Sequence, residues 1–332
     1  MYNSFGNPGL VKVLNFLQTH DTEYLSGQDL SDVLKISRVA VWKHIKKLKD
    51  LGYTIESKQK LGYKLTENTE LLLPWEVTSG LKTKWIGHQV YYFDSTDSTQ
   101  NQALKLANES ESDGTVVIAG KQTGGKGRDG RKWISPPGGI WISVIIKPKL
   151  DISKITLFPI ASSLALAVSI EKIFKINPEL KWPNDITLKG KKLAGMIVDA
   201  SVESNKVENL VLGAGINFDV DSKNIEKLLK ETANFYGVAS LSKNRKKIKP
   251  VQLVQSFLLE LEKIYDLLDE GKIKKIISEW TKRSSTIGKK IEVNTINGEK
   301  IGTAIKIDEE GGLWISTKDK NERIIAGDIV HR

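Results

Sequence analysis

The sequence predicts an α+β protein of several domains: a basic helical module, then a mixed α/β domain, then a small all-β module. Its 332 residues exceed the length of one average domain. Nine Lys and Arg residues, against two acids, fall within residues 35–64, which sets the first module apart. Strands alternating with helices begin near Leu71, and short strands alone return from Ser284. We therefore expect domains at residues 1–66, 67–283 and 284–332.

Composition narrows the class of protein. Hydrophobic residues make up 39% of the chain and charged residues 27%, which is enough to build a core. The absence of cysteine excludes disulfides, thiolate metal sites and thiol nucleophiles. The longest apolar stretch, LFPIASSLALAVSI, is interrupted by Pro159 and three serines, and MYNSFGNPGL lacks the pattern of a secretion signal. We therefore expect a soluble cytoplasmic protein with no membrane segment.

The first module reads as a winged helix-turn-helix. Amphipathic helices are predicted at GLVKVLNFLQTH and QDLSDVLKI, and a third begins after Ser37 in RVAVWKHIKKLKDLG. Two short strands around a lysine-rich tip, YTIESKQKLGYKL, follow as a wing. Ser37 and the outward basic residues are predicted to bind DNA: the basic residues are Arg38, Lys43, Lys46, Lys47, Lys58 and Lys60. A three-helix bundle with a solvated basic face is the alternative, although the lysines of the wing disfavour it.

The central domain is predicted from alternating patterns. Strands are expected in HQVYYFDST, GTVVIAGKQ, GIWISVIIKP, ELKWPNDITLKGKKLAGMIVDA and NLVLGAGINF. Helices are expected in STQNQALKLANES, in FPIASSLALAVSIEKIF and over residues 251–283. We also expect the strand GIWISVIIK to offer a free pairing edge for a homodimer. The last module, with turns at NTINGEK and DEEGG, predicts a small β-barrel.

One loop, GKQTGGKGRDGRKWISPPGG at residues 120–139, carries two overlapping nucleotide patterns. Gly125, Gly127 and Gly130 have the dinucleotide-binding spacing, and residues 120–126 resemble a phosphate loop that lacks its Ser or Thr. Both patterns require a helix to follow, whereas two prolines, two glycines and a strand follow here. We therefore interpret it as a glycine-hinged lid whose cations close over a phosphate. The alternative is a flexible surface loop with incidental basic residues.

Five motifs occur in a characteristic order: DSTDSTQ, GGKGRDGRKW, KWPND, KLAGMIVDA and GAGIN. Together they resemble the catalytic domain of biotin protein ligases, and the resemblance covers nearly the whole chain. The first module is similar to that of the bifunctional subclass, in which the ligase is also the biotin operon repressor. The last module, ending GDIVHR, resembles the SH3-like C-terminal domain of the family. The resemblance implies a class II aminoacyl-tRNA synthetase-like central fold.

Residue roles follow from this resemblance. It implies Lys181 and Arg128 as catalytic cations. The biotin-binding residues that it implies are Ser98, Thr99, Gln100, Gln122, Lys126, Gly127, Arg128, Lys181, Gly213 and Gly215. Those for the adenylate are Arg131, Trp133 and Asn217, with core packing an equal alternative for Trp133. The chain departs from the family at Gln100, Lys126 and Asp129, where Asn, Arg and a basic residue are usual. Asp199 stands where a Glu is common and receives no role.

The reaction implied by the resemblance has two steps. Biotin reacts with ATP to give biotinyl-5′-AMP, and the biotinyl group then passes to a lysine of a biotin carboxyl carrier protein. Mg²⁺ is implied by attack on ATP, while the four scattered histidines form no metal constellation, so no metal ligand is assigned. Operator DNA and a homodimer of the adenylate-bound protein are the further implied partners. An effector-binding regulator without ligase activity, and a lipoate ligase, are the alternatives.

Overall fold

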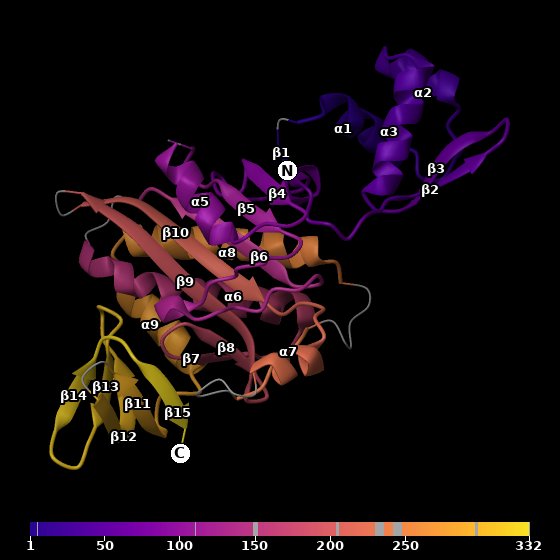
Figure 1. Ribbon diagram of the computed structural model, residues 1–332. Coiled ribbons are helices and arrows are strands. Elements are labelled where there is room, and N and C mark those ends of the chain that lie inside the picture. Colours follow the sequence, from indigo (N-terminus) through magenta and orange to yellow (C-terminus); the bar gives the residue numbers. More distant parts are fainter. Residues whose placement is uncertain are drawn as a thin grey trace.

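Three units follow one another along the chain in the computed structural model (Figure 1). The structure describes residues 1–4, 6–109, 111–148, 152–203, 206–229, 236–241, 248–295 and 298–331. Two predicted elements lie partly outside the described residues. The predicted turn at residues 294–300 includes residues 296–297, and the predicted helix STQNQALKLANES includes residue 110. The winged module lies at one end of the large sheet, and the small β module lies toward the opposite end, near β7 and β8.

The N-terminal module has the predicted helices and wing. Its elements are α1 (Pro8–Thr19), α2 (Gly27–Leu34), α3 (Arg38–Asp50), β2 (Thr54–Lys58) and β3 (Gly62–Glu67). The Ser26 and Ser37 side chains accept hydrogen bonds from Asp29 N and Ala40 N, and so cap α2 and α3. The apolar stripe of α3 is buried, which leaves its basic residues exposed. The predicted helix-turn-helix with a wing is therefore confirmed.

A short N-terminal arm ties this module to the central domain. The strand β1 (Tyr2–Asn3) pairs antiparallel with β4 (Val90–Phe93) at the edge of the large sheet. The Tyr2 ring lies 6.1 Å from the Trp75 ring, edge to face, and 5.4 Å from the Lys47 ammonium of α3. The Trp75 indole N–H donates to the Tyr53 hydroxyl at 2.8 Å. The sequence pattern had indicated no strand in this arm.

The central domain is built on an eight-stranded sheet of order β1-β4-β5-β6-β10-β9-β8-β7. Only β4 and β5 are parallel, and the other neighbouring pairs are antiparallel. The remaining strands are β5 (Val116–Ala119), β6 (Ile140–Ile146), β7 (Glu179–Lys181), β8 (Asp185–Leu188), β9 (Lys191–Glu203) and β10 (Lys206–Ile216). The expected free edge on β6 is wrong, because β6 pairs with β5 on one side and β10 on the other.

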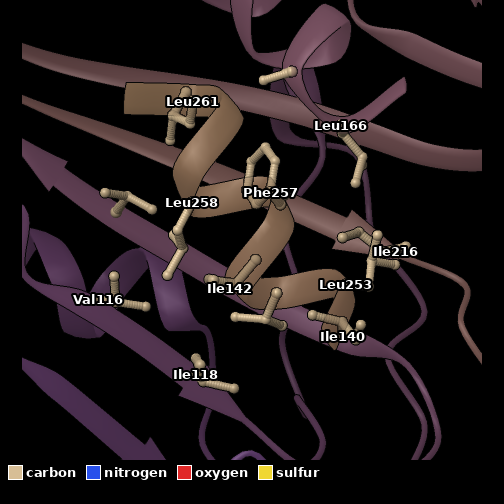
Figure 2. Close-up of a cluster of buried hydrophobic side chains, with 14 of the residues drawn as sticks. Val116, Ile118, Ile140, Ile142, Leu166, Ile216, Leu253, Phe257, Leu258 and Leu261 are labelled. Carbon is tan, nitrogen blue, oxygen red and sulfur yellow. The ribbon is translucent and has the colours of Figure 1, made fainter. Parts of the chain in front are cut away.

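Helices cover both faces of this sheet. The helices α6 (Phe158–Phe174) and α8 (Pro250–Asp269) pack on one face, where Leu253, Phe257 and Leu258 of α8 belong to one buried cluster with Ile140 and Ile142 of the sheet (Figure 2). The other face is covered by α5 (Thr99–Asn108), whose Ala103 and Ala107 are buried. The shorter helical elements are α4 (Pro74–Thr78), α7 (Ser222–Leu229), a 3₁₀ turn at Arg128–Gly130 and another at Ile152–Leu157.

One long apolar helix is buried in the core, and one predicted helical region is divided in two. Within the described ranges, one stretch, Lys154–Phe174, has the length and hydropathy of a membrane-crossing helix, and 72% of its apolar window is buried inside the protein. The predicted helical region 251–283 is divided into α8 and α9 (Ile273–Lys282). The break contains Gly271, whose φ of 69° is left-handed and therefore ends α8 at no steric cost.

The C-terminal module is all-β, as predicted. Its strands are β11 (Lys290–Thr295), β12 (Gly298–Ile307), β13 (Leu313–Ser316), β14 (Asn321–Ile324) and β15 (Asp328–His331), in the order β14-β13-β12-β11-β15. The indole N–H of buried Trp182 donates to Gly311 O at 3.0 Å, and Trp182 N donates to the Thr286 hydroxyl. These bonds dock the module against the β7–β8 hairpin and bring β15 to the rim of the site described next.

Candidate active site

A cavity of about 530 Å³ opens between the sheet, the start of α5, the loop at residues 122–135 and β15. Every residue that the sequence selects for biotin or the adenylate lines it: Ser98, Thr99, Gln100, Gln122, Lys126, Gly127, Arg128, Arg131, Trp133, Lys181, Gly213, Gly215 and Asn217. The fold therefore gathers these widely separated positions in one place. Their individual roles stay predictions. Asp185, Lys192, Gly195, Tyr236 and Asp328 also line the cavity, and sequence reasoning assigned none of them to it.

A buried polar network forms one end of the cavity. Ser98 caps α5 by accepting a hydrogen bond from Gln100 N at 3.2 Å, as a helix-capping serine does. The Gln122 amide oxygen accepts from Thr99 N at 2.7 Å, and its nitrogen donates to the Ser135 hydroxyl at 2.8 Å. Amides and hydroxyls held in this way present both donors and acceptors. A planar ligand such as a cyclic urea needs both kinds of group.

Gln100 is held on three sides. Its amide nitrogen donates to Val211 O at 2.8 Å and to the Asp199 carboxylate at 3.0 Å, and its oxygen accepts from Ser143 at 3.0 Å. A Cβ at Gly213 would lie 2.5 Å from that oxygen, so only glycine admits the amide there. The Gln100 amide is thus engaged by three neighbouring strands, through Ser143 of β6, Asp199 of β9 and Val211 of β10. Asp199, which received no role from the family resemblance, orients this side chain.

The lid forms a tight loop between two strands, and no α-helix follows it before β6, as the sequence predicted. Gly127 N donates to Arg131 O at 2.7 Å, which closes the turn. The Arg128 guanidinium donates to Gly327 O at 2.7 Å and to the Asp328 carboxylate at 2.8 Å. Arg131 also pairs with Asp328. The C-terminal module therefore holds the lid through one carboxylate.

The charge state of Asp328 favours this contact. Burial alone would raise the pKa of its carboxyl, but the hydrogen bond from Arg131 and the charges of Arg128 and Arg131 outweigh burial, so the pKa is lowered. The carboxylate is therefore ionised at neutral pH, and it engages both arginines. Asp129 adds a second carboxylate, which lies 3.2 Å from Arg128 Nε.

Replacing Asp328 with asparagine is expected to loosen the lid, because the charge-assisted bonds to both arginines are lost. Limited trypsin digestion of the ligand-free protein should cut after Arg128 and Arg131 about tenfold faster than in the parent if a bond to a charged group is worth about 1.5 kcal/mol. The control is Asp319→Asn, an exposed carboxylate of the same module. Equal cleavage rates in parent and Asp328→Asn would show that Asp328 does not hold the lid.

Trp133 lies flat against the sheet inside the cavity. A Cβ at Gly215 would lie 2.5 Å from the indole nitrogen, and one at Gly195 would lie 3.1 Å from the ring. The indole N–H is buried with no hydrogen-bond partner among the described residues. The Lys192 ammonium lies 5.2 Å from the ring centroid. Trp133 thus lines the cavity while its indole nitrogen is buried against the sheet at Gly215.

The predicted catalytic lysine ends β7 inside the cavity. The Lys181 side chain is 8% exposed, and desolvation by burial lowers its pKa. Asn217, at the end of β10, is 4% exposed, and its amide donates to Lys192 O at 3.3 Å. The Lys126 ammonium donates to Asn101 Oδ1 at 2.5 Å, so this cation is directed across the lid to α5.

The residues selected for DNA lie on the separate winged module, and all of them are exposed. Arg38, Lys43 and Lys46 lie along α3 with the exposed Trp42 between them, and Lys58 and Lys60 lie in the wing. Lys47 differs, because its ammonium faces Tyr2 of the N-terminal arm. The fold therefore keeps a basic surface apart from the cavity.

Comparison with known proteins agrees with this arrangement. Residues 92–217 match the Biotin/lipoate A/B protein ligase family, residues 10–64 an HTH domain and residues 286–332 the Biotin protein ligase C terminal domain. The Bifunctional ligase/repressor BirA of Bacillus subtilis is 36% identical over 309 residues, covering 92% of this chain and 94% of that protein. The protein of the same name from Escherichia coli is 27% identical, covering 88% of each chain.

A solved structure shares the fold of most of the chain. The biotin protein ligase from Aquifex aeolicus, in complex with biotin and ATP, matches with a TM-score of 0.62 and 25% identity. The match covers 73% of this chain and 98% of that one. Together with the relatives that match along nearly the full length, it shows that this chain belongs to the biotin protein ligase family, among the members that carry an N-terminal helix-turn-helix module.

Proposed function

We propose that the protein activates biotin with ATP, transfers the biotinyl group to a lysine of a biotin carboxyl carrier protein, and represses biotin genes by binding operator DNA with biotinyl-AMP as corepressor. The observation that carries the proposal is the meeting of the predicted biotin and adenylate residues in one cavity, while the basic residues lie on a separate winged module. The similarity to bifunctional ligase/repressors over most of the chain supports both activities.

In the first half-reaction, the biotin carboxylate attacks the α-phosphorus of ATP, and pyrophosphate leaves. Nucleophile and leaving group both come from the substrates, so the protein has only to position them and to neutralise charge. Lys181 lies inside the cavity, where its ammonium can stabilise charge on the α-phosphate. Arg128 and Arg131, released from Asp328, would close the lid over the adenylate.

In the second half-reaction, the ε-amine of the carrier lysine attacks the carbonyl carbon of the mixed anhydride. The bond between that carbon and the phosphate oxygen breaks, and AMP leaves with the electron pair. The amine loses a proton as the amide forms. A lid that opens at the C-terminal module would let the carrier lysine reach the anhydride while water is kept out between turnovers.

Magnesium belongs to the proposal, because attack on ATP requires neutralised phosphate charge. The carboxylates that line the cavity, Asp185 and Asp328, are engaged by Lys192 and Arg131. In the part of the chain that the structure describes, no three His, Cys, Asp or Glu residues are grouped to hold a metal ion. The residues present do not fit a resident metal site. We expect Mg²⁺ to arrive on the phosphate oxygens of ATP with several of its waters.

The finer architecture is also proposed. The proposed domains are residues 1–66, 67–283 and 284–332. The strand β1 of the first domain pairs with β4 in the sheet of the second. The mixed sheet, antiparallel apart from one pair, supports a class II aminoacyl-tRNA synthetase-like centre, and the five-stranded antiparallel sheet supports an SH3-like barrel. We further propose a cytoplasmic protein that forms a homodimer when the adenylate is bound.

The test is transfer of biotin to an acceptor domain with ATP and Mg²⁺, run beside operator binding. The double variant Lys43→Glu, Lys46→Glu should abolish operator binding and keep transfer, because both side chains are exposed on α3 of the winged module and neither lines the cavity. These substitutions are preferred to deletion of residues 1–66, which would also remove β1 from the large sheet. No transfer with intact operator binding would identify an effector-binding regulator, and transfer of lipoate instead would identify a lipoate ligase.

Substitution of two glycines should distinguish the binding of ATP from the binding of biotin. Gly215→Ala is expected to displace Trp133 and weaken ATP binding by about tenfold, whereas Gly213→Ala should displace Gln100 and weaken biotin binding by a similar factor, since each forced contact costs about 1–3 kcal/mol. Calorimetry of each variant with biotin and with a non-hydrolysable ATP analogue is the measurement, and each variant controls for the other. If both variants lose both ligands equally, the two ends of the cavity do not divide the substrates in this way.

A further inference from the structure

The described surroundings of Lys181 contain an aromatic partner in place of an anion. The Lys181 ammonium lies 3.7 Å from the centroid of the Tyr236 ring, well inside the range of a cation–π interaction. The side chain forms no ion pair with any carboxylate of the described residues. An ammonium held by an aromatic face keeps its N–H donors free for an incoming anion.

Tyr236 is itself fixed from two sides. Its hydroxyl donates to the Asp185 carboxylate at 2.5 Å. The backbone that follows is bonded to β9, because Lys192 N donates to Gly237 O at 3.0 Å and Ala239 N donates to Lys192 O at 2.9 Å. The ring therefore has little freedom to leave the ammonium, and its position is set by the same strand that carries Lys192.

Burial and the charges facing Lys181 act on its pKa in opposite directions, and the net effect lowers the pKa. Asp185 on β8 and Asp328 on β15 favour the charged amine, whereas Lys192 on β9 and, above all, burial disfavour it. Asp185 is already engaged by the Lys192 ammonium at 2.7 Å and by the Tyr236 hydroxyl, so it does not reach Lys181 as an ion-pair partner. This site therefore requires a group that attracts the Lys181 ammonium without neutralising its charge.

We propose that Tyr236 is a positioning residue for the adenylation reaction, whose ring holds the Lys181 ammonium charged and directed into the cavity until substrate anions arrive. A carboxylate in the same place would satisfy the ammonium and compete with the biotin carboxylate and the phosphate. The ring does neither. This inference rests on the proposed function, since it assigns Tyr236 to the reaction at that site.

The test compares Tyr236→Phe, which keeps the ring and loses the hydroxyl, with Tyr236→Leu and Tyr236→Met, which lose the ring. Single-turnover adenylate formation is measured against pH in each. Without the ring, the alkaline limb of the profile is expected to move to lower pH by about one unit, a tenfold change in the protonation equilibrium of the lysine. In Tyr236→Phe the alkaline limb should lie at the same pH as in the parent.

A second readout does not depend on activity. The protein is labelled with ¹³C at lysine Cε, the Lys181 resonance is identified by its absence from Lys181→Met, and its titration is followed without substrates. A Lys181 pKa that is lower in the two ring-less variants supports the proposal. An unchanged titration and an unchanged alkaline limb in a folded ring-less variant overturn it. If neither ring-less variant folds, a Tyr236→Phe titration that moves with loss of the hydroxyl alone also overturns it.

The ligase function and the role of Tyr236 can fail separately. If the parent forms no adenylate but Lys181 titrates lower without the ring, the proposed function is wrong and the role of the ring in holding the charge stands. If the parent forms adenylate and the ring-less variants titrate like the parent, the ligase function stands and Tyr236 is a packing residue.

Discussion

Lys181→Ala is expected to slow adenylate formation about 30- to 1000-fold, which corresponds to about 2–4 kcal/mol of lost stabilisation if the ammonium acts as an oxyanion donor does. The reason lies in its placement, because a cation that is 8% exposed acts on the phosphate with little screening by water. Biotin and ATP should still bind through the remaining contacts. The measurement is single-turnover formation of biotinyl-AMP at saturating substrates.

Two variants make this result specific. Lys181→Met keeps the volume of the side chain and should match Lys181→Ala in rate, which separates lost charge from a collapsed cavity. Lys105→Ala removes an exposed lysine of α5 in the same domain and should leave the rate unchanged. A normal single-turnover rate in Lys181→Ala would remove Lys181 from the mechanism.

Arg128→Gly is expected to release biotinyl-AMP about 10- to 100-fold faster, because a bond between the guanidinium and a phosphate is worth about 1.5–3 kcal/mol. The substitution also removes the bonds to Gly327 O and Asp328, which link the lid to the C-terminal module. The released anhydride should label lysines of bystander proteins unselectively. Dissociation of labelled adenylate and biotin blotting of an added bystander protein are the measurements.

The neighbouring residue supplies the control. Asp129 has a φ of 56°, a conformation that glycine adopts freely, and its carboxylate pairs with Arg128. Asp129→Gly is therefore tolerated by the backbone and frees Arg128 for the phosphate, so it should not accelerate release. If Arg128→Gly and the parent release the adenylate at the same rate, the retaining role of Arg128 is refuted.

Residue types and their spacing along the chain were sufficient to predict the elements that are determined by neighbouring residues. The apolar spacing of α3 and its cap at Ser37 predicted a helix whose basic residues face solvent. Two prolines and two glycines after the lid excluded a helix there, and with it both nucleotide-loop readings. These features involve residues a few positions apart, whose geometry is set by the backbone period and by the residue types themselves. The family resemblance then named the residues that the fold gathers in one cavity.

The contacts that complete the site depended on the tertiary structure. Asp328 holds Arg128 across 200 positions of sequence, Asp199 orients Gln100 across 99, and Tyr236 covers Lys181. The position of β6 between β5 and β10 could not be predicted either. A fully apolar strand has the same sequence pattern whichever strands pair with it. Sequence by itself determined most of the helices and strands of the three modules, since those are local properties, but not β1, whose two residues form a strand only because β4 lies beside them. Which carboxylate meets which cation was decided by strand order and domain docking, because a charge carries no sequence signal of the partner that the fold will bring to it.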